Sequence, residues 1–429
     1  MSLLVENKSA VTQNLMEQLQ KHASKIAFIP DEEIVSAIRV LEEKGVPNNK
    51  HEDYKYCNIE SYLRREFKTL EQTFNTVSNA DIAPFKLDEA INIVVLNGTY
   101  NEDLSEKIIV KGITIKTLNE VDAKEKALIA TQAKSSNDAL IALNSAFTNK
   151  GLYLQIDRAN VIPMPIHVIY VNSNNAQALV NSRNFIYAQA NSEVTIVESF
   201  VNIGSSKVFS NYVSEKYLEE NAKLNCFTIQ NEGALSYAVN TNQVKVSKYA
   251  NYSNSTFTMS GELVRNNHNV ELASADCEAH LNGLFVTNAT QLVDNHTLID
   301  HQMPNCQSNE LYKGIAKDKS TGVFNGKIYV RKDAQKTNAY QSSKNILLSD
   351  DATINTKPQL EIYADDVKCS HGTSTGKVDE EALFYLKARG IGDTSARKLL
   401  LQAFAQELID KIEIESLQQR VLNLFEKAL

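Results

Sequence analysis

The densest group of metal-capable and nucleophilic residues lies in residues 367–377, which read Val-Lys-Cys-Ser-His-Gly-Thr-Ser-Thr-Gly-Lys. Cys369 and His371 are two positions apart, and on an extended strand this spacing places both side chains on one face. A thiolate together with an imidazole suits iron, zinc or copper(I). Lys368, and His371 when protonated, would favour the thiolate form of the cysteine. Two ligands are half a metal site, so the others must come from elsewhere in the fold or from another chain. A packed or solvated pair is the simpler alternative.

A looser group of potential ligands is formed by His296, His301 and Cys306. Spacings of five residues alternate between the two faces of a strand, so these side chains converge only if the Met-Pro-Asn turn before Cys306 brings them together. Histidines with structural or surface roles are the simpler interpretation of this group. His280 beside Cys277 has a weaker claim to be a site.

The glycines and the lysine of residues 372–377 superficially resemble a phosphate-binding loop. The motif G-x-x-x-x-G-K-[ST] requires four residues between its glycines and a hydroxyl residue after its lysine. Here three residues intervene and Val378 follows, so we expect no ATP to be bound by this chain. The sequence also lacks Gly-x-Ser-x-Gly, His-Glu-x-x-His and a carboxylate pair with a defined role. We therefore expect no catalytic residues.

Composition restricts the compartment and the partners. The five cysteines of the 429-residue chain include no Cys-x-x-Cys pair, which excludes a zinc ribbon, a thioredoxin motif and a self-contained ferredoxin cluster. The first residues lack the features of a targeting segment, and no run of about eighteen apolar residues could cross a bilayer. A net charge of −8 argues against nucleic acid and anionic membranes as partners. We expect a cytoplasmic protein.

Periodicity divides the chain into three zones, which we interpret as an N-terminal helical domain (residues 1–90), a β core (91–365) and a C-terminal helical domain (366–429). In the first zone Asp31 is the expected N-cap of a helix that Gly45 ends. The apolar stripe of this helix is predicted to contain Ile34, Val35, Ile38 and Leu41.

The middle zone consists of short alternating runs rich in Val, Ile, Thr, Phe and Tyr, such as residues 194–201, and residues 118–147 interrupt it with helical patterns. A small residue followed by a strand at regular intervals favours a β-helix coil over a closed barrel, with a β-sandwich as the competing interpretation. The alanines in question, at intervals of 32, 28 and 29 residues, are Ala190, Ala222, Ala250 and Ala279.

A solenoid must cover its two ends, because the last coil otherwise exposes apolar surface and unpaired strand edges. Burying apolar area contributes roughly 25 cal/mol per Å². We expect the flanking helical zones to cap the ends. An uncovered sheet edge would offer a place for a partner chain that has a similar edge.

The third zone returns to a helical pattern. Asp379 is the expected N-cap of its first helix and Gly390 the expected end, and two further helices are predicted near residues 394–408 and 417–425. Their broad apolar faces are typical of packing against the body, and less often of docking a partner helix. The apolar side of the first helix is predicted to contain Leu383, Phe384 and Leu386.

Seven ordered blocks within residues 290–410 make the chain resemble the SufB/SufD family, and the N-terminal segments KGVP (44–47) and EDYKY (52–56) extend the likeness. SufB sequences typically have His-Glu-Ala where this chain has His371-Gly-Thr, so the resemblance is greater to the SufD branch. The blocks are residues 295–308 (NHTLIDHQMPNCQS), 312–314 (YKG), 323–328 (VFNGKI), 333–337 (DAQKT), 356–362 (TKPQLEI), 364–373 (ADDVKCSHGT) and 384–391 (FYLKARGI).

This resemblance implies a right-handed parallel β-helix between helical domains, and a complex with a SufB-like subunit and two copies of a SufC-like ATPase. In that family an iron–sulfur cluster is built transiently at the SufB–SufD interface, where the position matching His371 contributes a ligand. Cys369 is the second candidate ligand from this chain. The C-terminal helices would dock the ATPase, and we expect the isolated chain to form a homodimer.

Two other functions stay open at this point. A SufB-like subunit would accept sulfur itself, and a β-helix carbohydrate-active enzyme would turn over a polyuronide without a partner. The enzyme interpretation rests on fold analogy alone, which is a poor warrant. The sequence makes no prediction about a flavin, the ligands from the partner chain or the order of iron and sulfur delivery.

Overall fold

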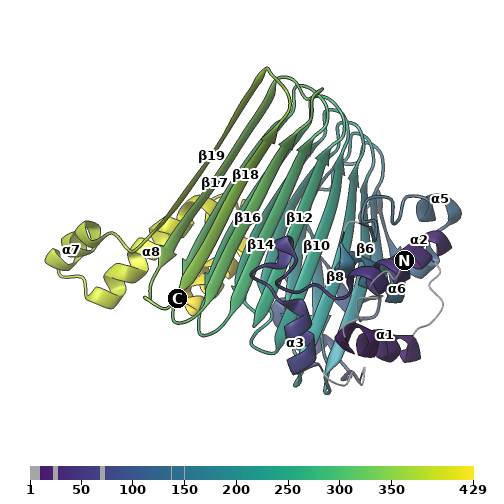
Figure 1. Cartoon of the computed structure of the whole chain (residues 1–429), viewed down its shortest axis with the longest axis horizontal. Coiled ribbons are helices and arrows are strands. Elements are labelled where there is room, and N and C mark those ends of the chain that lie inside the picture. The colour runs from purple at the N-terminus through teal and green to yellow at the C-terminus, as the bar shows by residue number, and fades with distance from the viewer. Residues whose placement is uncertain (1–9, 23–27, 68–72, 137, 149) are drawn as a thin grey trace, which may run out of the picture.

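The computed structural model describes residues 10–22, 28–67, 73–136, 138–148 and 150–429. Two long sheets face each other, and from β4 onward the chain adds one strand to each sheet in turn, which makes a β-solenoid of about 8 turns (Figure 1). All strand pairings are parallel except β1 with β2 and β3 with β4, which are antiparallel. The predicted parallel β-helix is therefore confirmed.

The strands of the two sheets are given in spatial order. The ten-stranded sheet contains β19 (Val367–Gly376), β17 (Thr337–Leu347), β15 (Gln307–Ala316), β13 (Glu278–Thr287), β11 (Asn251–Ser260), β9 (Lys223–Asn231), β7 (Glu193–Asn202), β5 (Ile166–Asn172), β1 (Ile91–Leu96) and β2 (Thr99–Asn101). The nine-stranded sheet contains β18 (Thr353–Ile362), β16 (Thr321–Val330), β14 (Leu292–His301), β12 (Leu263–Leu272), β10 (Ser236–Val246), β8 (Val208–Leu218), β6 (Ala178–Ala188), β4 (Gly151–Ile156) and β3 (Ile113–Thr117).

Sharp corners lead into six strands of the ten-stranded sheet, β7, β9, β11, β13, β15 and β17. The backbone is left-handed at each of these corners, a conformation that Asn and Asp tolerate better than most residues, and the next residue is small and buried. The left-handed residues are Asn191, Asn221, Tyr249, Asp276, Asn305 and Lys336. The small residues that follow them are Ser192, Ala222, Ala250, Cys277, Cys306 and Thr337.

The alanine rhythm in the sequence therefore marks the corners only in part. Ala222 and Ala250 are corner residues, whereas Ala190 precedes its corner by two positions and Ala279 lies inside β13. A corner needs a small side chain and not alanine in particular, since Ser192 and Cys277 occupy equivalent places.

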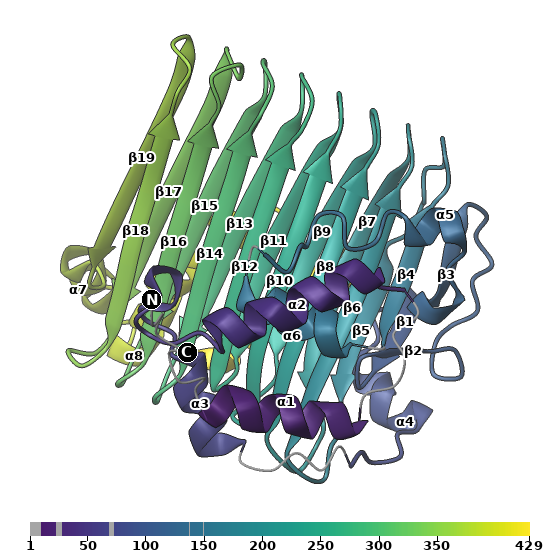
Figure 2. The same ribbon diagram turned by 45° about the vertical axis from the view of Figure 1, so that its right-hand side comes forward.

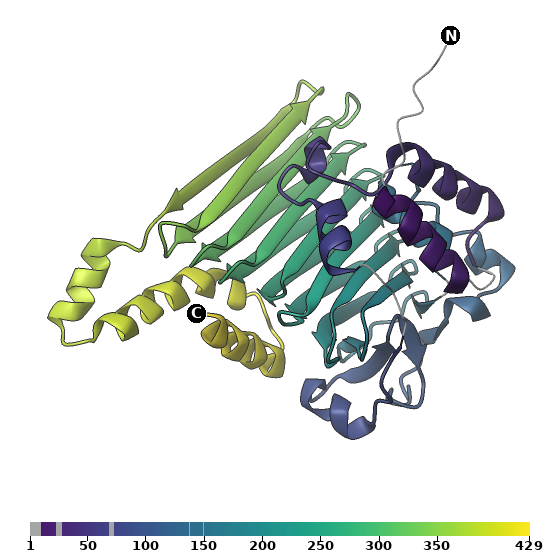
Figure 3. The same cartoon turned by 60° about the horizontal axis from the view of Figure 1, so that its bottom comes forward.

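The helices cover the outer faces of the two sheets and leave the last coil open, so the prediction that they cap both ends is wrong. α1, α2, α3 and α6 pack on the nine-stranded sheet, and α8 and α9 pack on the ten-stranded sheet (Figure 2, Figure 3). The helices are α1 (Ala10–His22), α2 (Asp31–Lys44), α3 (Ile59–Glu66), α4 (Asn79–Ile82), α5 (Ala123–Lys126), α6 (Ala139–Phe147), α7 (Glu380–Ala388), α8 (Asp393–Ile409) and α9 (Glu415–Ala428), with short 3-10 turns η1 (Glu52–Tyr54), η2 (Ala83–Phe85) and η3 (Leu118–Glu120).

Two helix predictions need correction. Asp31 is the first residue of α2 and not its N-cap, since Pro30 holds that position without a side-chain cap. Val35 is 68% exposed, because α2 buries Ala37, Val40 and Leu41 instead. The helix ends at Gly45, whose φ of 69° confirms the predicted stop.

The strand region continues past residue 365, because β19 pairs with β17 along its whole length before the chain becomes helical. Asp379 then caps α7 by accepting hydrogen bonds from the amides of Glu381 and Ala382, as predicted. The predicted apolar side of α7 is wrong for Phe384, which is 74% exposed, while Leu383 is buried. α7 lies beyond the β18–β19 end of the solenoid (Figure 1).

One buried carboxyl opposes folding at neutral pH. Glu232, in the corner between β9 and β10, is buried, and neither carboxylate oxygen has a hydrogen-bond partner among the described residues. Burial raises the pKa of this carboxyl to about 7. The pKa of this carboxyl is higher in the folded chain than in the unfolded chain. The carboxyl therefore costs the fold no stability below about pH 4.5, and the free energy of unfolding decreases as the pH rises to about 7.

Glu232→Gln is therefore expected to raise the free energy of unfolding at pH 8 by up to about 3 kcal/mol, and by much less at pH 4.5. The amide keeps the shape of the protonated carboxyl and cannot ionise. Urea denaturation of both proteins at the two pH values measures this difference. An equal gain at both pH values would contradict the assignment.

Candidate functional site

The candidate site lies on β19, the last strand of the ten-stranded sheet. β19 pairs with β17 on one side, and no strand of the described chain pairs with its other edge. Nearly all of its residues are exposed, whereas inner strands such as β7 are mostly buried. The edge therefore presents unpaired backbone amides and carbonyls, which another β-strand can use.

Cys369 and His371 lie on the same face of β19, as the spacing predicted. Cys369 packs with Ile328, Val330 and Ala339 in the interior of the solenoid, so His371 also belongs to the inward face. Cys369 is half-buried, whereas His371 is exposed because no further coil covers it. The imidazole is thus accessible from outside the chain at the open end of the interior.

The expectation that the neighbours of Cys369 favour its thiolate is wrong. Desolvation by burial raises the pKa of Cys369 above its ordinary value, and a backbone hydrogen bond from Ala339 offsets this in part. Lys368 forms no ion pair within the described part of the chain, and its side chain alternates to the outer face of the strand. A metal ion would have to displace the proton of this thiol.

The described residues contain no group of three or more His, Cys, Asp or Glu side chains that could hold a metal ion. Within the described ranges, Cys369 and His371 are therefore a partial set of ligands. Structural zinc sites use four ligands and catalytic sites at least three, so the missing ligands would have to come from another molecule.

The other three candidate ligands do not all converge, because His301 and Cys306 lie near each other in the interior and His296 lies on the opposite face of β14. His296 lies on the outer face of the nine-stranded sheet, where its Nε2 is 2.9 Å from Asp294 Oδ1, while His301 faces inward and bonds to Ser308 Oγ at 2.9 Å. The pKa of Cys306 is lowered, chiefly by the neighbouring Cys277 and to a smaller extent by His301. The predicted structural role is the better description of these histidines.

His280 and Cys277 are likewise separated. His280 Nε2 is 2.7 Å from Glu278 Oε1 on the outside of β13, whereas Cys277 is buried at an interior corner. The glycine-containing segment 372–377 is extended along β19 and its end, unlike the strand–loop–helix geometry of a phosphate loop. No helix in the part of the chain that the structure describes is long and apolar enough to span a bilayer.

One feature next to the site was missed from the sequence. α7 exposes Phe384 and Tyr385, at 74% and 58%, close in sequence to β19. Adjacent exposed aromatic side chains are typical of interaction surfaces. The sequence alone does not reveal this exposed pair, because apolar residues at these positions also fit a helix that packs against the body. Only the structure shows which face of α7 is buried.

These features define a class of protein: a helix-flanked parallel β-solenoid whose uncapped edge carries an incomplete set of metal-capable side chains. Residues 170–404 match the family described as SUF system FeS cluster assembly, SufBD core domain, and residues 13–168 match the SufBD protein N-terminal region. The chain belongs to the SufBD family.

Individual relatives agree with this assignment. The iron–sulfur cluster assembly protein SufD of Escherichia coli is 28% identical over 388 residues, which cover 90% of each chain. A SufBD family protein of iron–sulfur cluster assembly from Synechocystis sp. is 29% identical and covers 90% of this chain and 88% of its own. The SufD protein of Bacillus subtilis is 27% identical, covering 76% of this chain and 75% of its own.

Proposed function

We propose that this chain is a SufD-like, non-catalytic subunit of a cytoplasmic scaffold on which iron–sulfur clusters are assembled. The observation that carries the proposal is the exposed imidazole of His371 on the inward face of an unpaired edge strand. A SufB-like subunit pairs with β19 and completes the coordination of a transient cluster or iron. The isolated chain pairs with a second copy through the same edge.

His371 is the principal ligand from this chain in the proposed site. A neutral imidazole binds iron through one ring nitrogen without ionisation of the side chain. Cys369 is the secondary ligand, because its half-buried thiol must lose a proton whose pKa is raised. In this proposal the cluster is cargo that the complex passes on. Each subunit supplies only some of the ligands, so the cluster assembles when the subunits meet and can be released when they separate.

A SufC-like ATPase docks on the C-terminal helices in this proposal. α8 and α9 bury their apolar faces against the ten-stranded sheet, and α7 is left with its aromatic side chains exposed. ATP is bound by that partner and not by this chain. Because the helices follow β19 directly, movement of the docked ATPase acts on the same end of the solenoid that holds the cluster.

The tagged chain is expected to co-purify with its SufB-like and SufC-like partners, together with iron and sulfide. A Phe384→Ser/Tyr385→Ser variant should lose the ATPase at least tenfold and retain the SufB-like subunit, because the aromatic pair is separate from the β19 edge. Quantitative mass spectrometry of the purified complexes measures both partners.

The matched control for this prediction is Tyr249→Ser, which removes a 51%-exposed tyrosine from a solenoid corner far from α7 in the sequence. This variant should retain all partners. Retention of the ATPase by the α7 double variant would contradict the docking surface, and absence of both partners from the unmodified chain would contradict the proposed function.

A further inference from the structure

Three residues of consecutive coils occupy register-paired positions on the inward face of the ten-stranded sheet, from the candidate site toward the interior. His371 on β19 is the register partner of Gln341 on β17, and Gln341 is the register partner of Glu310 on β15. Side chains at paired positions of parallel strands point to the same side and stack at the strand spacing of about 4.8 Å. The column therefore leads from the open end into the solenoid.

The amide of Gln341 is fixed in one orientation. Its Nε2 donates a hydrogen bond to Glu310 Oε2, and both side chains are 3% exposed. A Cβ at Gly326, on the facing strand β16, would lie 2.3 Å from Gln341 Nε2 and 2.6 Å from Phe324 Cζ. The glycine thus provides the space that the amide occupies, and the amide has little freedom to turn.

The oxygen of the same amide is left without a partner. Gln341 Oε1 is buried and accepts no hydrogen bond from the described residues. A buried unpaired acceptor lowers stability, and it can accept a hydrogen bond from a group that approaches it. Since the amide nitrogen is bound by Glu310 in the preceding coil, the oxygen remains available to the following coil, where His371 is the register partner.

A histidine that binds a metal through one ring nitrogen usually donates the N–H of its other nitrogen to a carbonyl or carboxylate oxygen. This second bond fixes the tautomer and the ring orientation. The proposed ligand His371 has no such hydrogen bond in the described chain, and the unpaired oxygen of Gln341 lies in the neighbouring position of the column.

We infer that Gln341 is the positioning residue of His371: Gln341 Oε1 accepts the ring N–H of His371 when iron or a nascent cluster is bound, and Glu310 holds the amide in place. This inference rests on the proposed function of His371 as a ligand. It assigns to the interior column a role in the binding of iron, beyond filling the solenoid.

Titration of the purified complex with ferrous iron against a competing chelator tests the inference. Gln341→Leu removes the acceptor at similar volume and should weaken iron binding about 10- to 100-fold, the usual effect of losing such a partner. Gln341→Glu retains an oxygen acceptor but loses the N–H that Glu310 accepts, so it should recover only part of the affinity. Gly326→Ala keeps the amide but displaces it, and should reproduce the loss.

The matched control is Asn345→Leu, which replaces another buried amide of β17 that also has an unpaired oxygen but is the register partner of Thr375. It should leave iron affinity unchanged. In a His371→Ala background, Gln341→Leu should have no further effect, whereas a purely structural role would persist there. If His371→Ala weakens iron binding and Gln341→Leu does not, the inference about Gln341 is overturned and the proposed function stands. If His371→Ala does not weaken iron binding, the proposed function itself is overturned.

Discussion

A complex that contains His371→Ala is expected to assemble with all its subunits and to lose most of its iron and sulfide. The imidazole is exposed on an edge strand and makes no contact on which the fold depends, so its removal should not disturb folding. The cluster would lose its proposed principal ligand from this chain, which leaves its coordination incomplete. Iron and acid-labile sulfide per complex, together with the visible absorbance, measure the loss.

The matched control for this prediction is His280→Ala. His280 is also partly exposed on a strand of the ten-stranded sheet, but it faces outward and pairs with Glu278. This variant should retain its cluster. Cys369→Ser is expected to have a smaller effect than His371→Ala, because the thiol is half-buried and packs in the interior. Undiminished iron and sulfide in the purified His371→Ala complex would count decisively against the site.

Local patterns favoured a β-helix but left a β-sandwich open, and the resemblance to the SufB/SufD family supplied the parallel β-helix that the structure confirms. The placement of the Cys-x-His pair followed from its spacing. Alternation of side chains has a period of two on any strand, so the common face of Cys369 and His371 follows from their spacing once the segment is extended. Burial of individual residues could not be predicted in the same way. Val35 and Phe384 fit apolar stripes by position, but the faces that α2 and α7 present depend on the sheets and on the open end.

The alignment of Glu310, Gln341 and His371 in one interior column could not be predicted from the sequence either. Glu310, Gln341 and His371 are separated by 31 and 30 residues, and coil lengths vary along the chain, so no fixed repeat aligns them. The corner that leads into β17 has Lys336 as its left-handed residue, which carries no turn signal.

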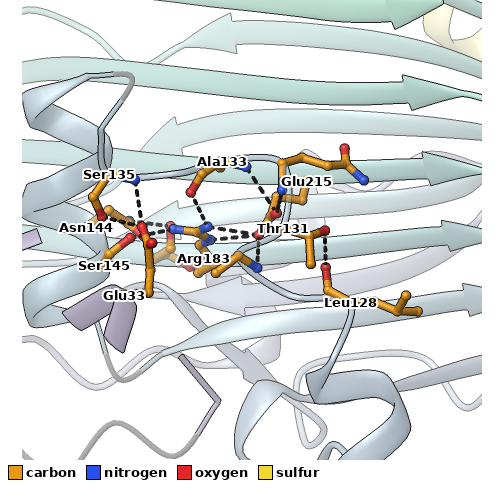
Figure 4. A network of polar contacts seen from close by, with 12 residues as sticks. Glu33, Leu128, Thr131, Ala133, Ser135, Asn144, Ser145, Arg183 and Glu215 are labelled. Carbon is orange, nitrogen blue, oxygen red and sulfur yellow. Dashed lines mark hydrogen bonds and ion pairs between the residues drawn. The ribbon is translucent and has the colours of Figure 1, made fainter. Parts of the chain in front are cut away.

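The ion pair between Arg183 and Glu215 is a second feature that the sequence pattern did not predict. Both are fully buried on the outer face of the nine-stranded sheet, where Arg183 Nη2 is 2.9 Å from Glu215 Oε1. Glu215 also accepts hydrogen bonds from the amides of Ala130 at 2.8 Å, Gln132 at 3.0 Å and Ala133 at 3.2 Å (Figure 4). One carboxylate thus holds the segment before α6 against β8.

Glu215→Leu is expected to lower the free energy of unfolding by about 3–5 kcal/mol, because it leaves the guanidinium of Arg183 buried without a counter-charge. The three amides of residues 130–133 also lose their acceptor, and the segment should detach locally before the solenoid unfolds. Urea denaturation measures the free energy, and hydrogen exchange of residues 128–135 measures the local opening.

Two comparisons separate burial of the charge from loss of a surface contact. Glu193→Gln breaks an exposed pair with Lys223, at 3.4 Å on the outside of the ten-stranded sheet, and should change stability by less than about 1 kcal/mol. Arg183→Met combined with Glu215→Leu removes both charges and should recover part of the loss, since an apolar pair of similar volume avoids the desolvation of an isolated ion. The loss of unfolding free energy that remains in the double variant then measures the cost of leaving the backbone amides of residues 130–133 without an acceptor. If Glu215→Leu alone proved no more destabilising than Glu193→Gln, the carboxylate would not be what holds the segment before α6 against β8.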